Sequence, residues 1–71
     1  MIPLAIAEER KTLKVLLISA DEKTKRHLEN IGVLRGSEIE IISKNYGNLI
    51  LRVKDGRLAI NKELSAKIYV D

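Results

Sequence analysis

Short runs of alternating aliphatic residues fill most of this sequence, and turn residues bound each run. Alternation of apolar and polar residues is typical of strands that bury one face, and each strand needs only a few residues. The chain has 71 residues, which is enough for one small core. We therefore expect a single, mainly β domain over residues 1–71.

The runs predict five or six strands. The first is a short strand around Leu4 and Ile6, and the second spans residues 12–19. The later strands are expected at residues 37–43, 49–54, 57–60 and 66–70. Two turns connect them, at residues 45–48 and at Asp55-Gly56. Asp-Gly between alternating runs favours a two-residue type I′ hairpin.

One stretch has a helical period instead, and a helix is expected at about residues 21–31. Its start has two candidate caps, Ser19 in a capping box with Glu22, or Asp21. Asn61 to Leu64 predicts a turn or a single helical turn near the end of the chain.

The end of the main helix is marked by Gly32, which can adopt the left-handed conformation just past a helix. With Gly32 in that place, Leu28 and Val33 occupy the two positions that touch in a Schellman motif. Five or six short strands with one inserted helix favour a small β-barrel, because a barrel leaves few strand edges exposed.

The order of these elements resembles the FeoA domain family over residues 2–70. The resemblance rests on Arg-His-Leu-Glu-Asn-Ile-Gly-Val-Leu-Arg-Gly at residues 26–36, on Leu-Ala-Ile at 58–60, and on Ser-Ala-Lys-Ile-Tyr-Val at 65–70. Two positions depart from the family pattern, Arg35 in place of Pro and Ile31 in place of Leu or Met. The resemblance implies an SH3-like barrel with an inserted helix.

The same resemblance implies a small cytosolic accessory protein of bacterial ferrous iron uptake. Its expected partner is the FeoB-type Fe(II) permease, met on the cytoplasmic GTPase side. Self-association is a further expectation, and recruitment to the inner face of the membrane would come through the partner. A stand-alone relative of the domain fused to iron-dependent repressors is a third possibility.

Composition argues against catalysis and against a resident metal or cofactor. The chain has no cysteine, and its one histidine, His27, lies beside Lys25 and Arg26, which would repel a cation. The family's link to iron therefore implies no metal ligands here. The longest aliphatic run, Val15 to Ile18, is far too short to span a bilayer. We expect a cytoplasmic protein that is not an enzyme.

More aliphatic residues are present than one small interior needs. Alternation predicts core positions at Val15, Leu17, Ile39, Ile41, Leu49, Leu51, Val53, Leu58, Ile60, Ile68 and Val70. It leaves Leu16, Ile18, Ile42, Ile50 and Tyr69 facing outward. Either the helix covers them, or a bulge changes the register, or they form a docking patch. The residues predicted to bind a partner are Leu16, Ile42, Tyr46, Ile50, Lys25 and Arg26.

The alternative function is nucleic-acid binding, which small barrels often perform. Net charge is +3, but 10 acidic residues are mixed with 13 basic ones. Such barrels stack bases on aromatic side chains, and the chain has only two tyrosines and no Phe or Trp. Nucleic acid is therefore not the expected partner.

Overall fold

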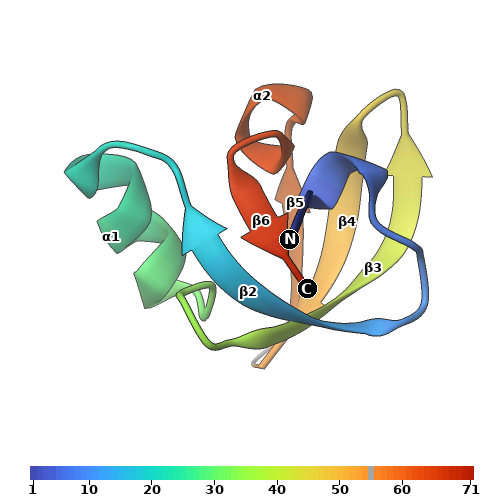
Figure 1. Cartoon of the computed structure of the whole chain (residues 1–71), viewed down its shortest axis with the longest axis horizontal. Coiled ribbons are helices and arrows are strands. Elements are labelled where there is room, and N and C mark those ends of the chain that lie inside the picture. Colours follow the sequence, from blue (N-terminus) through green and yellow to red (C-terminus); the bar gives the residue numbers. More distant parts are fainter. Residues whose placement is uncertain (55) are drawn as a thin grey trace.

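A computed structural model describes residues 1–54 and 56–71, and within them six antiparallel strands form one curved sheet (Figure 1). The strands are β1 (Ile2–Pro3), β2 (Thr12–Ile18), β3 (Glu38–Asn45), β4 (Asn48–Val53), β5 (Gly56–Ile60) and β6 (Ile68–Val70). Their order in the sheet is β1-β6-β2-β3-β4-β5. The helix α1 (Glu22–Asn30) is inserted between β2 and β3. The predicted mainly β fold with one inserted helix is confirmed.

Strand β2 belongs to both halves of the sheet. Residues Thr12 to Lys14 pair with β3, and Val15 to Ile18 pair with β6. The register shifts between Val15 and Leu17, so Leu16 is the extra residue of a bulge. A bulge bends a strand and increases its twist. This bend lets β2 turn from one partner to the other and wrap the sheet around the core.

The core consists of aliphatic side chains from every strand but β1, and from α1 and the segments beside the strands. Burial of this apolar surface is the main favourable contribution to folding. The buried residues are Leu4, Ala7, Leu13, Val15, Ile18, Leu28, Val33, Ile39, Ile41, Leu49, Leu51, Ile60, Ile68 and Val70. Val53 and Leu58, predicted as core, are half-buried and pack against this cluster.

The predicted first strand is wrong beyond Pro3, because residues Leu4–Ile6 form one 3-10 turn, η1. The Ala7 N–H donates to the Leu4 carbonyl at 3.1 Å and closes the turn. Residues three apart on a 3-10 helix lie above one another. Leu4 and Ala7 are therefore both buried, whereas Ile6 is exposed.

Both ends of α1 have well-defined caps. Asp21, not Ser19, is the N-cap, and its carboxylate accepts from the Thr24 N–H at 2.7 Å. At the other end the Val33 N–H donates to the Leu28 carbonyl at 2.8 Å. The Gly32 N–H donates to the Glu29 carbonyl at 3.1 Å, with Gly32 at φ +97°. These are the two bonds of a Schellman motif, which confirms the predicted helix end.

The two predicted hairpin turns differ in outcome. Between β3 and β4, Tyr46 and Gly47 have φ of +53° and +86°, and a type I′ turn needs positive φ at both central residues. Between β4 and β5, Gly56 lies in β5 opposite Val53, so the prediction that Gly56 belongs to the turn is wrong. Asp55 lies outside the described residues.

The last helical segment, α2 (Lys62–Ser65), follows Asn61 as predicted. The Asn61 side chain accepts from the Leu64 N–H at 2.8 Å and caps the turn. The Ser65 hydroxyl is fully buried and lies 3.1 Å from the Gly47 carbonyl and 2.8 Å from the Lys62 carbonyl. These contacts attach α2 to the β3–β4 turn.

Candidate docking site

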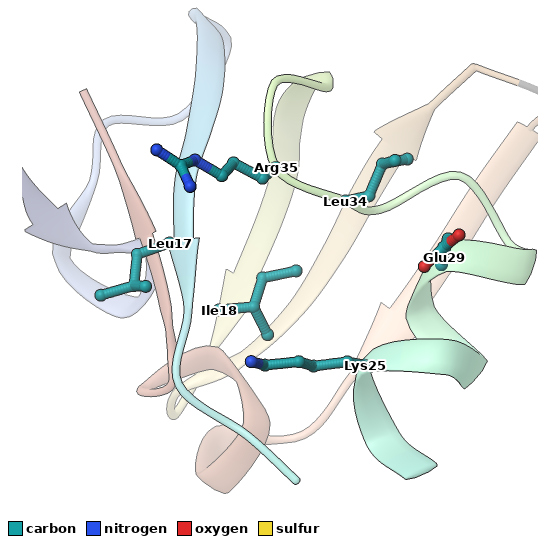
Figure 2. Close-up of a pocket in the computed structure, with 6 residues that line it drawn as sticks. All are labelled: Leu17, Ile18, Lys25, Glu29, Leu34 and Arg35. Atoms are coloured by element: carbon teal, nitrogen blue, oxygen red, sulfur yellow. The ribbon is translucent and has the colours of Figure 1, made fainter. Parts of the chain in front are cut away.

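A pocket lies where the end of β2, helix α1 and the loop before β3 meet (Figure 2). Its volume is about 320 Å³, at the lower end of the range for small-molecule sites. Its lining combines aliphatic and charged side chains, namely Leu17, Ile18, Lys25, Glu29, Leu34 and Arg35. We call this the α1–β2 groove.

The bulge in β2 sets which side chains meet the groove. Ile18 is only 8% exposed, and Leu17 is 43% exposed, the reverse of the predicted orientation. The predicted orientation follows unbroken alternation. The alternative of a bulge that changes the register is the one confirmed here, because the extra residue at Leu16 shifts the alternation by one. Figure 2 shows Leu17 leaving β2 on the side away from α1 and Ile18 on the side toward it.

Leu34 forms the other apolar edge of the groove. It is 42% exposed, and a tight turn with Ser37 fixes its position. The Leu34 N–H donates to the Ser37 hydroxyl at 3.1 Å, and the Ser37 N–H donates to the Leu34 carbonyl at 2.9 Å. An exposed leucine held in place keeps its apolar surface available without the entropic cost of ordering a flexible loop.

Two cations and one carboxylate accompany these aliphatic side chains in the lining. In Figure 2, Lys25 reaches from α1 toward Ile18, and Arg35 extends from the loop toward β2. Lys25 Nζ lies 4.0 Å from Glu22 Oε1, but the Glu22 side chain is 85% exposed, so this pair is weak. Glu29 is the acidic residue of the lining.

The groove continues toward the start of α1, where Asp21 and Lys67 line an adjoining hollow. The hydrogen bonds from Thr24 lower the pKa of Asp21 below its ordinary 3.8. Because the Asp21 carboxylate already accepts from the Thr24 N–H, its charge supports the helix start. The two hollows are thus lined by three cations, Lys25, Arg35 and Lys67, and by two carboxylates, Glu29 and Asp21.

The six predicted partner-binding residues do not form one surface. Lys25 lines the groove, whereas Arg26 is exposed on α1 and does not contribute to the lining. Leu16, expected to face outward, is half-buried within the β2 bulge.

The other three predicted residues belong to the β3–β4 hairpin. Ile50 pairs with Ser43, and Ile42 is the extra residue of a second bulge, between Ile41 and Ser43. Both isoleucines are half-buried, and Tyr46, at the tip of the hairpin, is 94% exposed. The sequence reasoning missed the exposed Leu17 and Leu34. Alternation carries no sign of the bulge that exposes Leu17, and Leu34 lies outside any alternating run.

Residues 1–54 and 56–71 contain no group of three His, Cys, Asp or Glu side chains placed to hold a metal ion. His27 is exposed on α1. No helix within the same residues has both the length and the apolar character needed to cross a bilayer. The lining of the groove supplies cations, one carboxylate and aliphatic surface, a combination suited to binding a polypeptide.

Comparison with known protein families finds a match to the FeoA domain over residues 2–71. The chain belongs to the FeoA domain family. Members are small accessory proteins rather than enzymes. A protein of Methanocaldococcus jannaschii, provisionally named Fe(2+) transport protein A, is 32% identical over 71 residues, which are 100% of this chain and 87% of the relative.

Solved structures agree with the fold. A FeoA-like protein from Clostridium acetobutylicum is 29% identical and superposes with a TM-score of 0.81, covering 99% of this chain and 84% of that protein. The zinc complex of FeoA from Stenotrophomonas maltophilia is 18% identical with a TM-score of 0.78, covering 100% of this chain and 91% of that one. That protein is described as an SH3 domain protein, so the predicted SH3-like fold is confirmed.

Proposed function

We propose that this FeoA domain is a cytosolic accessory protein of ferrous iron uptake that binds the cytoplasmic GTPase side of a FeoB-type permease. The proposal rests on family membership together with the relative named for Fe(2+) transport. The description of the Stenotrophomonas protein raises the possibility that it acts as a ferrous iron transport activating factor, and this description supports the proposal. The contact would bring the domain to the inner face of the membrane.

The observation that carries a binding role is the exposure of Leu17 and Leu34 on either side of the α1–β2 groove. Two exposed leucines beside a hollow offer apolar surface that another molecule can cover. Binding there would act on the permease by favouring one state of its gating or GTPase cycle, with no bond chemistry in this chain.

The hairpin residues Ile42, Ile50 and Tyr46 remain a second proposed contact. Because Ile42 and Ile50 are half-buried, they offer less apolar surface than the two exposed leucines. Nucleic acid is not favoured, since the groove lining has no aromatic side chain on which a base could stack.

The test is binding of the chain to the soluble domain of the permease, measured with and without guanine nucleotide. Leu17→Ser with Leu34→Ser should weaken binding at least about tenfold. Ile6→Ser is the matched control, since Ile6 is 69% exposed but lies in η1, outside the groove. Ile50→Glu tests the hairpin. No binding of the unaltered chain in either nucleotide state would refute the proposed function.

A further inference from the structure

Within residues 1–54 and 56–71, one edge of β2 has no strand beside it where it borders the groove. Pairing with β3 ends at Lys14, whereas pairing with β6 occupies the other edge through Ile18. Among the described residues, no strand pairs with the first edge at residues 16–18. The turn at Ser37 and Gly36 covers it only at Val15, through bonds of 2.9 and 2.7 Å.

The backbone groups at this edge belong to Ile18. The Ser19 N–H donates to the Lys67 carbonyl at 2.7 Å, toward β6. On a strand, successive residues direct their N–H and C=O groups to opposite edges. The N–H and C=O of Ile18 therefore point away from β6, toward the α1–β2 groove that Ile18 lines. An edge of this kind is a template for another strand.

Charge around this edge selects for an acidic occupant. Lys25 and Arg35 line the groove beside Glu29, and Lys67 lines its continuation beside Asp21, so three cations stand against two carboxylates in the lining. A guanidinium or ammonium beside a partly enclosed groove attracts carboxylates and repels lysines. Leu34 and Leu17 provide apolar contacts beside these charges.

We propose that an extended, acidic segment of the partner adds as a strand to the open edge of β2 at residues 16–18. Its carboxylates lie against Lys25 and Arg35, and an aliphatic side chain lies against Leu34. Main-chain hydrogen bonds to Ile18 supply affinity, and the flanking charges supply specificity. This deepens the proposed function, on which the identity of the partner rests, by naming the chemistry of the segment that binds.

The first experiment needs no knowledge of the partner. A random dodecapeptide display library is selected on the unaltered chain, and in parallel on Lys25→Glu with Arg35→Glu. We expect peptides with an aliphatic residue next to Asp or Glu from the first selection, and loss of that acidic preference on the charge-reversed chain. Neutral or basic peptides from the first selection, or no enrichment, would overturn the proposal.

The second experiment asks whether the selected peptide pairs as a strand. Amide hydrogen exchange of Ile18 is measured by NMR with and without the peptide. Strand addition should slow exchange at Ile18 at least about tenfold, since a free N–H becomes hydrogen-bonded. Unchanged exchange at Ile18, together with chemical-shift changes at Leu17 and Leu34, would mean side-chain docking alone and would refute the strand.

The third experiment separates this inference from the proposed function. Lys25→Glu and Arg35→Glu should each weaken binding to the permease domain about tenfold, whereas Lys11→Glu, an exposed cation outside the groove, should change it less than about twofold. If the permease binds all variants equally, the proposed function stands and the acidic segment is refuted. If the acidic peptide binds as a strand but the permease does not bind, only the partner is wrong.

Nucleic acid is the competing occupant of a basic groove. Single-stranded DNA is therefore tested for binding to the unaltered chain, to Leu34→Ser and to Lys25→Glu. The proposal is overturned if the DNA displaces the selected peptide, and if its binding persists in Leu34→Ser but is lost in Lys25→Glu. This pattern would indicate nucleic acid because the phosphates would bind the cation Lys25 and would not need the apolar side chain of Leu34.

Discussion

Leu17 of β2 lies directly opposite Tyr69 of β6, while the next residue, Ile18, lies opposite the buried Ile68. This register exposes Leu17 beside the groove and buries Ile18 within the core. Paired residues on antiparallel strands share a face, so the partner strand decides which side of β2 is inside. The docking surface therefore depends on how β2 pairs with β6.

Replacement of each of these two β2 residues by alanine tests that register. Ile18→Ala should lower the free energy of unfolding by about 2–3 kcal/mol, because it leaves a cavity in the core. Leu17→Ala should lower it by less than about 1 kcal/mol, since nearly half of that side chain is already exposed. Urea unfolding at low temperature measures both. Equal losses, or a larger loss at Leu17, would contradict the observed orientation.

Gly47 lies against the side chain of Lys62 in α2. A Cβ at this position would lie 2.7 Å from Lys62 Cγ, and its φ is +86°. Gly47→Ala should destabilise the protein by about 1–2 kcal/mol from the backbone conformation alone. Displacement of Lys62 should add to that loss.

The matched control for Gly47 is Gly36→Ala. Gly36 has a similar φ of +93° with no neighbouring atom within 4 Å of the added Cβ. It should show the backbone cost without the steric one. Thermal unfolding of both variants gives the difference, and a larger loss at Gly36 would rule out the Lys62 contact as a constraint.

The buried Ser65 hydroxyl joins α2 to the β3–β4 turn. Ser65→Ala removes the hydrogen bond to the Gly47 carbonyl and should cost about 1–2 kcal/mol. Ser43→Ala, at an exposed position on β3, should change stability by less than about 0.5 kcal/mol. Both are compared by denaturant midpoint. A neutral Ser65→Ala would show that α2 is held by its apolar contacts instead.

The N-cap of α1 makes stability depend on pH. The pKa of Asp21 is lowered by its hydrogen bonds with Thr24, so the folded state favours the ionised carboxylate. That stabilisation is fully present above the unfolded pKa, near 3.8, and is lost as pH falls through the lower folded pKa.

Asp21→Asn keeps a capping side chain but removes this titration. Between about pH 6 and about pH 2, the unaltered chain should therefore lose more stability than the variant. Urea midpoints at both pH values measure the difference, and the other carboxylates affect both proteins alike. An identical pH dependence would show that Asp21 does not contribute through its charge.

Local sequence patterns predicted much of the fold. Gly32, with Leu28 and Val33 at the right spacing, fixed the end of α1, because the two bonds of the motif involve only neighbouring residues. Alternation found β3 and β4, since both pair with neighbours along the chain through a short turn. The family resemblance added the SH3-like barrel, and the FeoA match supports it.

The residues of the candidate site could not be predicted from local sequence patterns. Of the six predicted partner-binding residues, only Lys25 lines the groove, and the exposed leucines were assigned to the core or not considered. Alternation reports which residues share a face, but it cannot report where a bulge shifts that face.

The sequence by itself indicated the family, and it determined most element types and the C-terminal end of α1, because these elements depend on contacts between residues close along the chain. The tertiary structure decided the rest. Residues 12–14 of β2 pair with β3, and residues 15–18 pair with β6, whose residues lie fifty or more positions later. To satisfy both partners, the strand takes an extra residue at Leu16. That one residue buries Ile18, exposes Leu17 and leaves open the edge of β2 that we propose a partner fills.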